Sequence, residues 1–238
     1  MKGKLYGVGV SIGEPELMTF KAANIIKSCE VIAVPAIDRE KSAAWKSAKK
    51  LIGEIDKKPT LCIEMPMTKD RKVLDEYHKK AAGTIEGELE KGRSVAFLTI
   101  GDPCVYATYM YVHRIVENDG FEAHITNGIT SFCAAAARVD ISLCEEDEQL
   151  HIIPASYGVE EALKYPGTKV FMKSGTGLLE TVGAIEKSAK EDNAQVYMVE
   201  NCGMENEKIY IGMESIKQKD MNDISYFTTI IVKENKHD

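Results

Sequence analysis

VAFLTIGDP, residues 95–103, predicts a short buried strand that ends in a tight turn before a helix. Residues 95–98 form a continuous apolar run within the expected strand 95–99, which is typical of a strand covered on both faces. Pro103 suits the first turn of a helix, because its φ is preset and it has no amide to leave unpaired. We therefore predict a strand–turn–helix unit, the repeating element of parallel α/β sheets.

Asp102 has two candidate roles in this turn. Its carboxylate can cap the next helix, expected over residues 104–117, by accepting backbone hydrogen bonds. It can also bind a ligand, because α/β sheets hold ligands at the carboxyl ends of their parallel strands. The turn alone leaves both roles open. Four side chains share one face of the expected helix, a pattern more typical of core than of a ligand site: Tyr106, Tyr109, Met110 and His113.

Strand and helix signals alternate through the first half of the chain, which predicts parallel strands joined by crossover helices. The turn Asn118-Asp119-Gly120 is the expected boundary, giving domains of residues 1–118 and 119–238. Strands follow at shorter intervals beyond it and predict a mixed sheet. The expected strands are residues 5–10, 31–35, 61–64, 95–99, 151–154, 170–173, 195–200, 208–211 and 226–232, with helices from Pro15 and over 39–52, 70–91, 104–117, 129–137 and 177–190.

Composition excludes several classes of function. The chain has 238 residues and a net charge of −7, which argues against general nucleic-acid binding. No run approaches the roughly 20 apolar residues of a membrane span, and no secretory leader is visible, so we expect a cytoplasmic protein with no membrane partner. The cysteines form no CxxC pair and have no ligand spacing with the histidines, so we expect mostly buried, reduced thiols and no metal site. They are Cys29, Cys62, Cys104, Cys133, Cys144 and Cys202.

A glycine-rich segment follows the first strand. Gly7, Gly9 and Gly13 have the spacing GxGxxxG, which differs from the GxGxxG of dinucleotide-binding folds and supports a nicotinamide enzyme only weakly. These glycines either relieve a tight turn or let a ligand approach the backbone. Glu14 suits the N-terminus of a helix but would repel a phosphate there.

Together these motifs resemble the tetrapyrrole methyltransferases, the class III S-adenosylmethionine enzymes, over essentially the whole chain. The Gly-Asp-Pro turn marks the broad family. The segments Thr108-Tyr109-Met110-Tyr111 and Gly128-Ile129-Thr130-Ser131-Phe132 resemble the subgroup that methylates carbon 20 of precorrin-2 or cobalt-precorrin-2 in cobalamin biosynthesis. Further matching segments are residues 5–10, 14–19, 97–103, 172–173, 199–202 and 226–228.

The resemblance implies two α/β domains of the tetrapyrrole methylase fold, with the cofactor cleft between them, usually in a homodimer. It implies S-adenosylmethionine as the methyl donor, which leaves as S-adenosylhomocysteine, and a tetrapyrrole substrate with or without cobalt. Carried over position by position, the implied cofactor contacts are Val10, Asp102, Val105, Tyr106, Thr130, Ser131, Met172, Cys202 and Thr228.

The first loop departs from the family pattern. The usual Gly-Pro-Gly-Asp-Pro is Ser11-Ile12-Gly13-Glu14-Pro15 here. Ser11 adopts a positive φ less readily than glycine does, and Ile12 adds bulk near the expected substrate trough. These changes bear on loop shape and substrate fit.

No catalytic residue is assigned. Candidates for the base that removes the proton from the methylated carbon, by side-chain type alone, are Tyr106, Tyr109, His113 and Glu64. Arginine or lysine side chains should meet the substrate carboxylates, and the candidates are Arg71, Arg114, Arg138 and Lys173. The alternatives are a metal-free precorrin-2 or uroporphyrinogen-III methyltransferase, a methyltransferase of diphthamide synthesis, and a non-catalytic tetrapyrrole-binding module.

Overall fold

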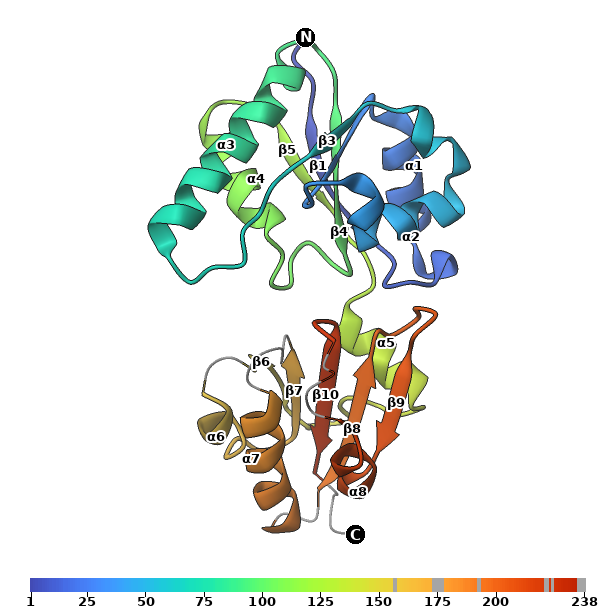
Figure 1. Ribbon diagram of the computed structural model, residues 1–238, viewed down its shortest axis with the longest axis vertical. Coiled ribbons are helices and arrows are strands. Elements are labelled where there is room, and N and C mark those ends of the chain that lie inside the picture. The colour runs from blue at the N-terminus through green and yellow to red at the C-terminus, as the bar shows by residue number, and fades with distance from the viewer. Residues whose placement is uncertain (156–157, 173–177, 192–193, 221–222, 224, 235–238) are drawn as a thin grey trace. The chain divides into compact units, whose positions relative to one another are not determined.

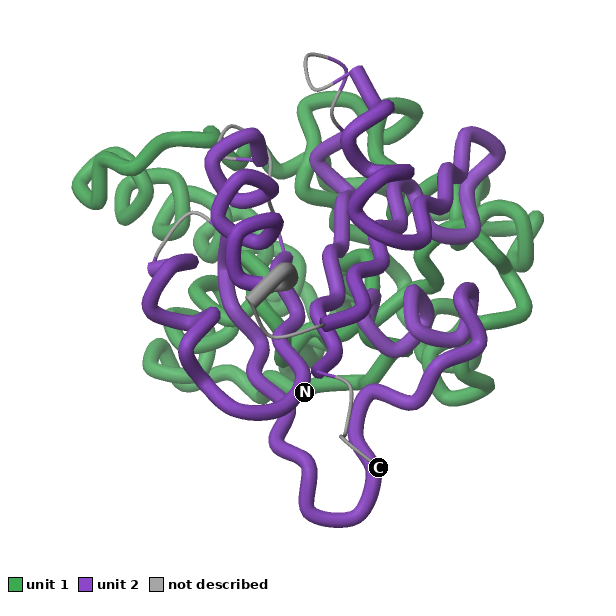
Figure 2. Tube along the Cα trace, turned by 90° about the horizontal axis from the view of Figure 1, so that it is seen from below, with its two compact units in different colours: residues 1–130 green, residues 131–238 purple. Residues whose placement is uncertain are grey.

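The computed structural model describes residues 1–155, 158–172, 178–191, 194–220, 223 and 225–234. The chain forms two compact units, unit 1 (Met1–Thr130) and unit 2 (Ser131–Asp238), coloured separately in Figure 2. The boundary lies later than the expected one after residue 118. The reason is β5 (Ala123–Thr126), a strand that the sequence did not reveal, which pairs in parallel with β1 (Leu5–Val10) and so belongs to the first sheet.

Unit 1 is built on a parallel sheet with the strand order β3-β2-β4-β1-β5. The central pair, β1 and β4, runs in register from Leu5 opposite Val95 to Val10 opposite Ile100. The predicted alternation of parallel strands and helices is thus confirmed. The other strands are β2 (Val31–Val34), β3 (Thr60–Cys62) and β4 (Val95–Ile100).

Helices cover both faces of this sheet, α1 and α2 on one side and α3 and α4 on the other (Figure 1). Alternate strand residues point to opposite faces. Val8 therefore lies in one apolar cluster with Trp45, whereas Leu5 lies in the other with Ile85. The helices are α1 (Phe20–Ser28), α2 (Ala43–Leu51), α3 (Arg71–Leu89) and α4 (Tyr109–Asn118), with 3-10 turns at Pro15–Leu17, Arg39–Lys41 and Gly53–Lys57.

Helices α1 and α4 begin later than expected. Pro15 opens a 3-10 turn, and α1 starts only after Thr19, whose hydroxyl accepts a hydrogen bond from the amide of Ala22 (3.1 Å). Helix α4 begins at Tyr109 instead of residue 104. The expected capping of this helix by Asp102 is therefore wrong, and Tyr106 precedes the helix instead of lying on its face.

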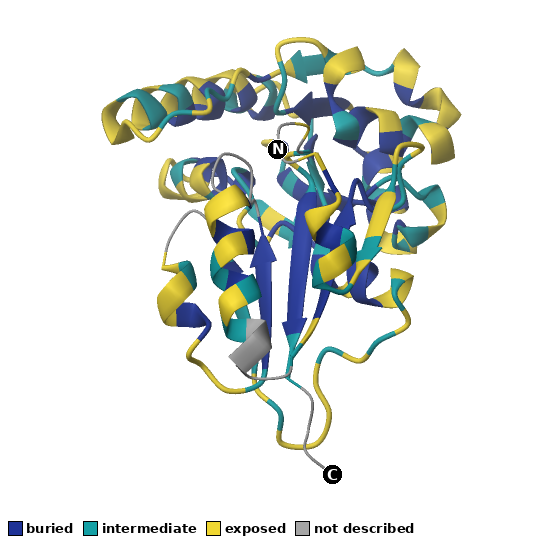
Figure 3. Cartoon of the chain, turned by 60° about the horizontal axis from the view of Figure 1, so that its bottom comes forward, coloured by how far each residue is buried: buried dark blue, intermediate teal, exposed yellow. Residues whose placement is uncertain are grey.

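Unit 2 contains a mixed sheet with the order β6-β7-β10-β8-β9, as expected. β6 and β7 are parallel, and the remaining pairs are antiparallel. The central strands are buried almost throughout (Figure 3). The short helices α6 and α8 were not expected. The elements are α5 (Ser131–Arg138), β6 (Leu150–Pro154), α6 (Val159–Ala162), β7 (Thr168–Met172), α7 (Leu178–Glu191), β8 (Gln195–Glu200), β9 (Lys208–Ile211), α8 (Met213–Lys217) and β10 (Thr228–Lys233).

The cysteines differ from expectation. Cys29 and Cys202 are buried, but the other four thiols are exposed, so the prediction of mostly buried thiols is wrong. All six are free. Within the described ranges, no helix has the length and apolar character needed to cross a membrane.

Candidate functional site

The predicted contacts of unit 1 lie at the carboxyl edge of its parallel sheet. Val10 is the last residue of β1, and the turn that contains Asp102 follows β4. Thr130 follows β5 in the same way. The sheet therefore brings these segments to one edge, although they are far apart in the sequence. The side chain of Val10 is fully buried in the core, so its backbone is the part that a ligand could approach.

Three glycines bring the ends of β1, β4 and β5 into backbone contact. A Cβ atom on Gly9 would lie 2.4 Å from the carbonyl oxygen of Gly101, and one on Gly128 would lie 2.0 Å from that same oxygen. Both distances are far shorter than van der Waals contact, so only glycine fits at either position. Gly101 itself has φ +74 and donates its N–H to the carbonyl of Val10 (2.9 Å). We call Gly9, Gly101 and Gly128 the glycine junction.

Asp102 ties two of these segments together. Its Oδ1 accepts a hydrogen bond from the amide of Cys104 (2.8 Å), which closes the turn after β4. Its Oδ2 accepts from the amide of Gly128 (3.0 Å) and from Nδ2 of Asn127 (3.4 Å). The side chain is buried, with 8% exposure. Both carboxylate oxygens are therefore engaged within unit 1.

The side chain of Thr130 fits a site for a bound polar ligand. Its Oγ1 is buried and has no hydrogen-bond partner in the part of the chain that the structure describes. Buried hydroxyl groups in folded proteins are nearly always hydrogen-bonded, so an orphaned one calls for a missing partner. The resemblance placed a cofactor contact at this residue. The orphaned hydroxyl suits a polar group of S-adenosylmethionine.

Tyr106 lies in the turn between β4 and α4 with φ +48. The left-handed region is unfavourable for a bulky aromatic residue, and such outliers cluster at functional sites. Its side chain is 40% exposed, and partial burial raises the pKa of its hydroxyl. Val105, half-buried beside it, donates its N–H to the carbonyl of Asp102 (3.2 Å).

Two of the four candidate bases belong to the core. The hydroxyl of Tyr109 bonds to Nδ1 of His113 (2.9 Å) and donates to the carbonyl of His124 (2.7 Å). Burial raises the pKa of Tyr109 and lowers that of His113. The Tyr109 ring also fills the space beside Gly7, where a Cβ atom would lie 2.1 Å from its Cε1. Tyr106 and Glu64 are the candidates that reach solvent.

The departures in the first loop are accommodated inside unit 1. Ser11 is fully buried, its hydroxyl bonds to that of Ser47 in α2, and the Ser47 hydroxyl also lies 3.1 Å from the Ser11 carbonyl. The positive φ in this loop falls on Gly13 (+127), so Ser11 needs none. Ile12 is buried at 3% exposure, and its effect on substrate fit stays a prediction.

Three of the predicted contacts in unit 2 lie at one edge of its sheet, namely Met172, Cys202 and Thr228. β10 runs antiparallel to both neighbours, with Thr228 opposite Glu200 and Thr229 opposite Met172. The start of β10 thus lies beside the ends of β7 and β8. Cys202 follows β8 and is buried, which raises the pKa of its thiol to about 11. Ser131, the remaining predicted contact in unit 2, is the half-buried first residue of α5.

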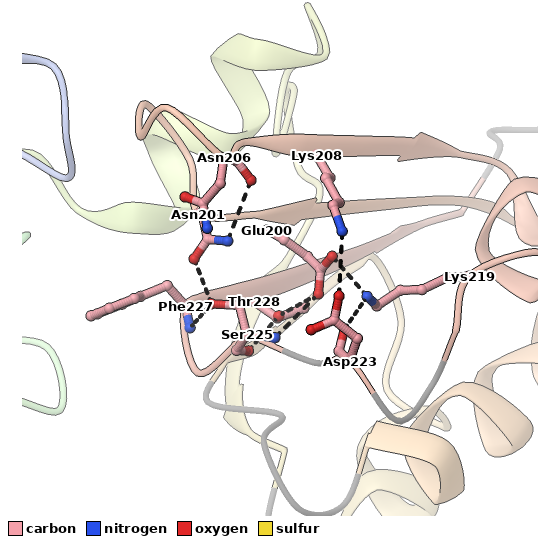
Figure 4. Close-up of polar contacts among 9 residues, drawn as sticks. All are labelled: Glu200, Asn201, Asn206, Lys208, Lys219, Asp223, Ser225, Phe227 and Thr228. Carbon is pink, nitrogen blue, oxygen red and sulfur yellow. Dashed lines mark hydrogen bonds and ion pairs between the residues drawn. The ribbon is translucent and has the colours of Figure 1, made fainter.

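A buried ion pair organises this edge (Figure 4). Oε2 of Glu200 lies 2.9 Å from Nζ of Lys219, and both side chains are 2% exposed. Oε1 of Glu200 accepts from the hydroxyl of Thr228 and from the amide of Ser225, both at 3.4 Å. The Thr228 hydroxyl also lies 2.7 Å from the Ser225 carbonyl. Glu200 was not among the predicted site residues, although a carboxylate that ends a buried apolar run is a signal that could have identified it.

Asn201 fixes the turn after β8. It has φ +50, which asparagine tolerates better than most residues. Its backbone N–H donates to the carbonyl of Phe227 (2.9 Å), and its side-chain Oδ1 accepts from the hydroxyl of Ser225. Nδ2 donates to the carbonyl of Asn206 (3.4 Å). The segments before β10 and after β8 are therefore joined.

The basic candidates for substrate carboxylates are scattered. Arg71 and Arg114 are exposed. Arg138 donates from Nε to Glu207 (2.9 Å), which occupies part of its guanidinium. Lys173 lies outside the described residues. Across the ranges that the structure describes, no cluster of three or more His, Cys, Asp and Glu side chains could hold a metal ion.

Comparison with known families decides the classification. Residues 4–215 match the model of the tetrapyrrole (corrin/porphyrin) methylases. The chain belongs to this family. It is 34% identical to a probable cobalt-precorrin-2 C(20)-methyltransferase of Methanocaldococcus jannaschii, over 98% of this chain and 97% of the relative.

Two further similarities agree with this classification. A precorrin-2 C(20)-methyltransferase of a Sinorhizobium species is 28% identical to this tetrapyrrole methylase, over 97% of this chain and 95% of that protein. The solved uroporphyrin-III C-methyl transferase of Thermus thermophilus, complexed with S-adenyl homocysteine, matches with a TM-score of 0.68 and 16% identity. That match covers 98% of each chain and confirms the predicted fold of two α/β domains.

Proposed function

We propose that this tetrapyrrole methylase transfers a methyl group from S-adenosylmethionine to carbon 20 of cobalt-precorrin-2 in anaerobic cobalamin biosynthesis. The observation that carries the proposal is the 34% identity, along almost the whole of both chains, to the probable cobalt-precorrin-2 enzyme. The segments 108–111 (Thr-Tyr-Met-Tyr) and 128–132 (Gly-Ile-Thr-Ser-Phe) support the same subgroup.

S-adenosylmethionine supplies a methyl group activated by a sulfonium. The chain supplies binding and alignment. We propose that the orphaned hydroxyl of Thr130 bonds to a polar group of the cofactor. Val10 is fully buried and Thr228 uses its hydroxyl within unit 2, so contacts from these two residues would come from backbone atoms. Val105, Tyr106, Ser131, Met172 and Cys202 stay predicted contacts.

The reduced macrocycle already offers an electron-rich meso carbon, so the reaction needs alignment more than activation. Bound S-adenosylmethionine would supply the methyl group and leave as S-adenosylhomocysteine, and the methylated carbon would release its proton to a base of the site. Holding the two reactants in line, with water excluded, can lower such a barrier by up to about 7–11 kcal/mol. A backbone fixed by close glycine contacts, as at the end of β1, is suited to this task.

The test is anaerobic incubation of the full chain with S-adenosylmethionine and cobalt-precorrin-2, precorrin-2 or uroporphyrinogen III, followed by mass spectrometry. We expect the mass of one added methyl on cobalt-precorrin-2. Methylation of uroporphyrinogen III alone would assign the other enzyme branch. Binding of tetrapyrrole without methyl transfer would assign a non-catalytic module, and no methylation of any substrate contradicts the proposal.

A second candidate is methylation of metal-free precorrin-2 at the same carbon. The near full-length similarity to the Sinorhizobium precorrin-2 enzyme favours it, at the lower identity of 28%. The same assay separates the two, because only one of the two precorrin-2 arms would then gain the methyl group. The homodimer implied by the resemblance and the cytoplasmic location expected from the sequence stay predictions.

A further inference from the structure

We propose that Asp102 is a positioning residue: it acts on the cofactor through the loop 127–130 and does not bind the cofactor with its own carboxylate. The inference rests on the proposed S-adenosylmethionine site. It changes the role that the resemblance gave to Asp102, which was a direct polar contact.

The carboxylate of Asp102 is used within the protein. Oδ1 is committed to the turn of Asp102 itself through the amide of Cys104 (2.8 Å). Oδ2 reaches across the sheet edge to the amide of Gly128 and to Nδ2 of Asn127. A carboxylate accepts hydrogen bonds but donates none, and a backbone amide is among its stronger partners. At 8% exposure, little of the group remains open to a ligand.

The loop that Asp102 contacts is held tightly. Gly128 packs on the carbonyl oxygen of Gly101 so closely that no Cβ atom fits between them. In addition, the hydroxyl of Thr19 donates to the carbonyl of Asn127 (3.3 Å). Asp102, Gly101 and Thr19 thus each contact the backbone of residues 127 and 128.

The same loop presents Thr130 to a ligand. Thr130 follows Gly128 by two residues, and its Oγ1 is buried without a hydrogen-bond partner in the described part of the chain. A small displacement of Gly128 therefore carries to this hydroxyl. Because the carboxylate of Asp102 is engaged and the hydroxyl of Thr130 is not satisfied by any described residue, the geometry assigns the polar contact to Thr130.

The first test needs no cofactor. Amide exchange is measured by NMR on the wild type and on Asp102→Asn, which keeps the size of the side chain but cannot accept from both the Cys104 and the Gly128 amides. We expect exchange of the Gly128 amide to become about tenfold faster or more, since its charged acceptor is either lost or replaced by a neutral oxygen that forms a weaker hydrogen bond. Amides within β4 should keep their rates. Unchanged exchange at Gly128 overturns the inference.

The second test is a double-mutant cycle on S-adenosylhomocysteine affinity, measured by calorimetry with the wild type, Asp102→Asn, Thr130→Ala and the double variant. If two residues act through one another, the free-energy effects of their substitutions on binding are not additive. If they make independent contacts, the fold-changes in affinity multiply. We expect each single variant to weaken binding about tenfold, and the double variant to bind no more weakly than the weaker single one. Multiplied effects would show a direct contact by Asp102 and overturn the inference.

Controls separate the possible failures. Asn127→Ala removes only the 3.4 Å contact, and its cycle with Thr130→Ala separates coupled from independent effects should Asp102→Asn not fold. Thermal unfolding verifies that each variant is folded. If the wild type does not bind S-adenosylhomocysteine, the proposed function is contradicted, while amide exchange still reports whether Asp102 holds the loop. Wild-type binding with multiplied effects contradicts this inference alone.

Discussion

Unit 1 joins the ends of β1, β4 and β5 by direct backbone contact, whereas unit 2 joins the end of β8 to the start of β10 through Glu200, a carboxylate that is paired with the buried Lys219. In unit 1 the glycine junction allows the ends of the strands to approach closely, and the Asp102 carboxylate accepts hydrogen bonds from neutral amides. In unit 2, Glu200 and Lys219 face each other with 2% exposure each. The difference predicts that different substitutions destabilise the two units. Unit 1 should lose stability when an atom is added at the glycine junction, and unit 2 when a charge is removed from the ion pair.

The largest effect is expected from Glu200→Gln in unit 2. The substitution keeps the size of the side chain and an acceptor for Thr228, but it leaves the ammonium of Lys219 buried without its counter-charge. Removing one partner of a buried pair typically lowers the free energy of unfolding by about 3–5 kcal/mol. Urea unfolding, with amide exchange in β8 and β10, measures the loss.

The matched control is the double variant Glu200→Gln with Lys219→Met. The double variant leaves no unpaired charge buried, so it should recover most of the lost stability. Substitutions at ordinary surface positions change the free energy of unfolding by no more than about 0.5 kcal/mol. A loss that small for Glu200→Gln alone would show that the ion pair does not stabilise this edge.

The strands that could be predicted are those with a continuous apolar signal. β4 and β8 are buried over most of their length, so their sequences are mostly apolar and the strand is easy to identify. β5 was missed because it is short and lies at the edge of its sheet, with one of its four residues buried. Its absence from the prediction placed the domain boundary too early.

The candidate site could be predicted only as a set of positions. The turn at Asp102 was identified, but its partner Gly128 lies 26 residues along the chain, and only the pairing of β1 with both β4 and β5 brings the two together. The same holds for Ser11 and Ser47, which are 36 residues apart. Local sequence patterns contain no information about such contacts, because tertiary packing creates them.

Gly128→Ala tests the steric side of the comparison and should have an intermediate effect. The added Cβ atom would lie 2.0 Å from the carbonyl oxygen of Gly101, so the backbone must move. Forcing extra atoms into a packed region typically lowers the free energy of unfolding by about 1–3 kcal/mol. Urea unfolding of the variant, with amide exchange at β1 and β4, measures the loss.

Gly83→Ala in α3 provides the matched control for this substitution. Its Cβ atom would meet nothing within 4 Å, and alanine in a helix interior is favoured over glycine by roughly 0.5–1 kcal/mol. The two alanine substitutions should therefore change stability in opposite directions. Equal effects would mean that the glycine junction is not a close steric contact.

The smallest effect is expected at the buried neutral pair of unit 1, which is the counterpart of the ion pair in unit 2. Ser47→Ala leaves the hydroxyl of Ser11 buried without its partner and should lower the free energy of unfolding by about 1 kcal/mol. Ser11→Ala with Ser47→Ala removes both hydroxyls, so it should be no less stable than the single variant. A loss as large as that of Glu200→Gln would contradict the comparison, because it would show that the neutral pair holds unit 1 as strongly as a buried charge holds unit 2.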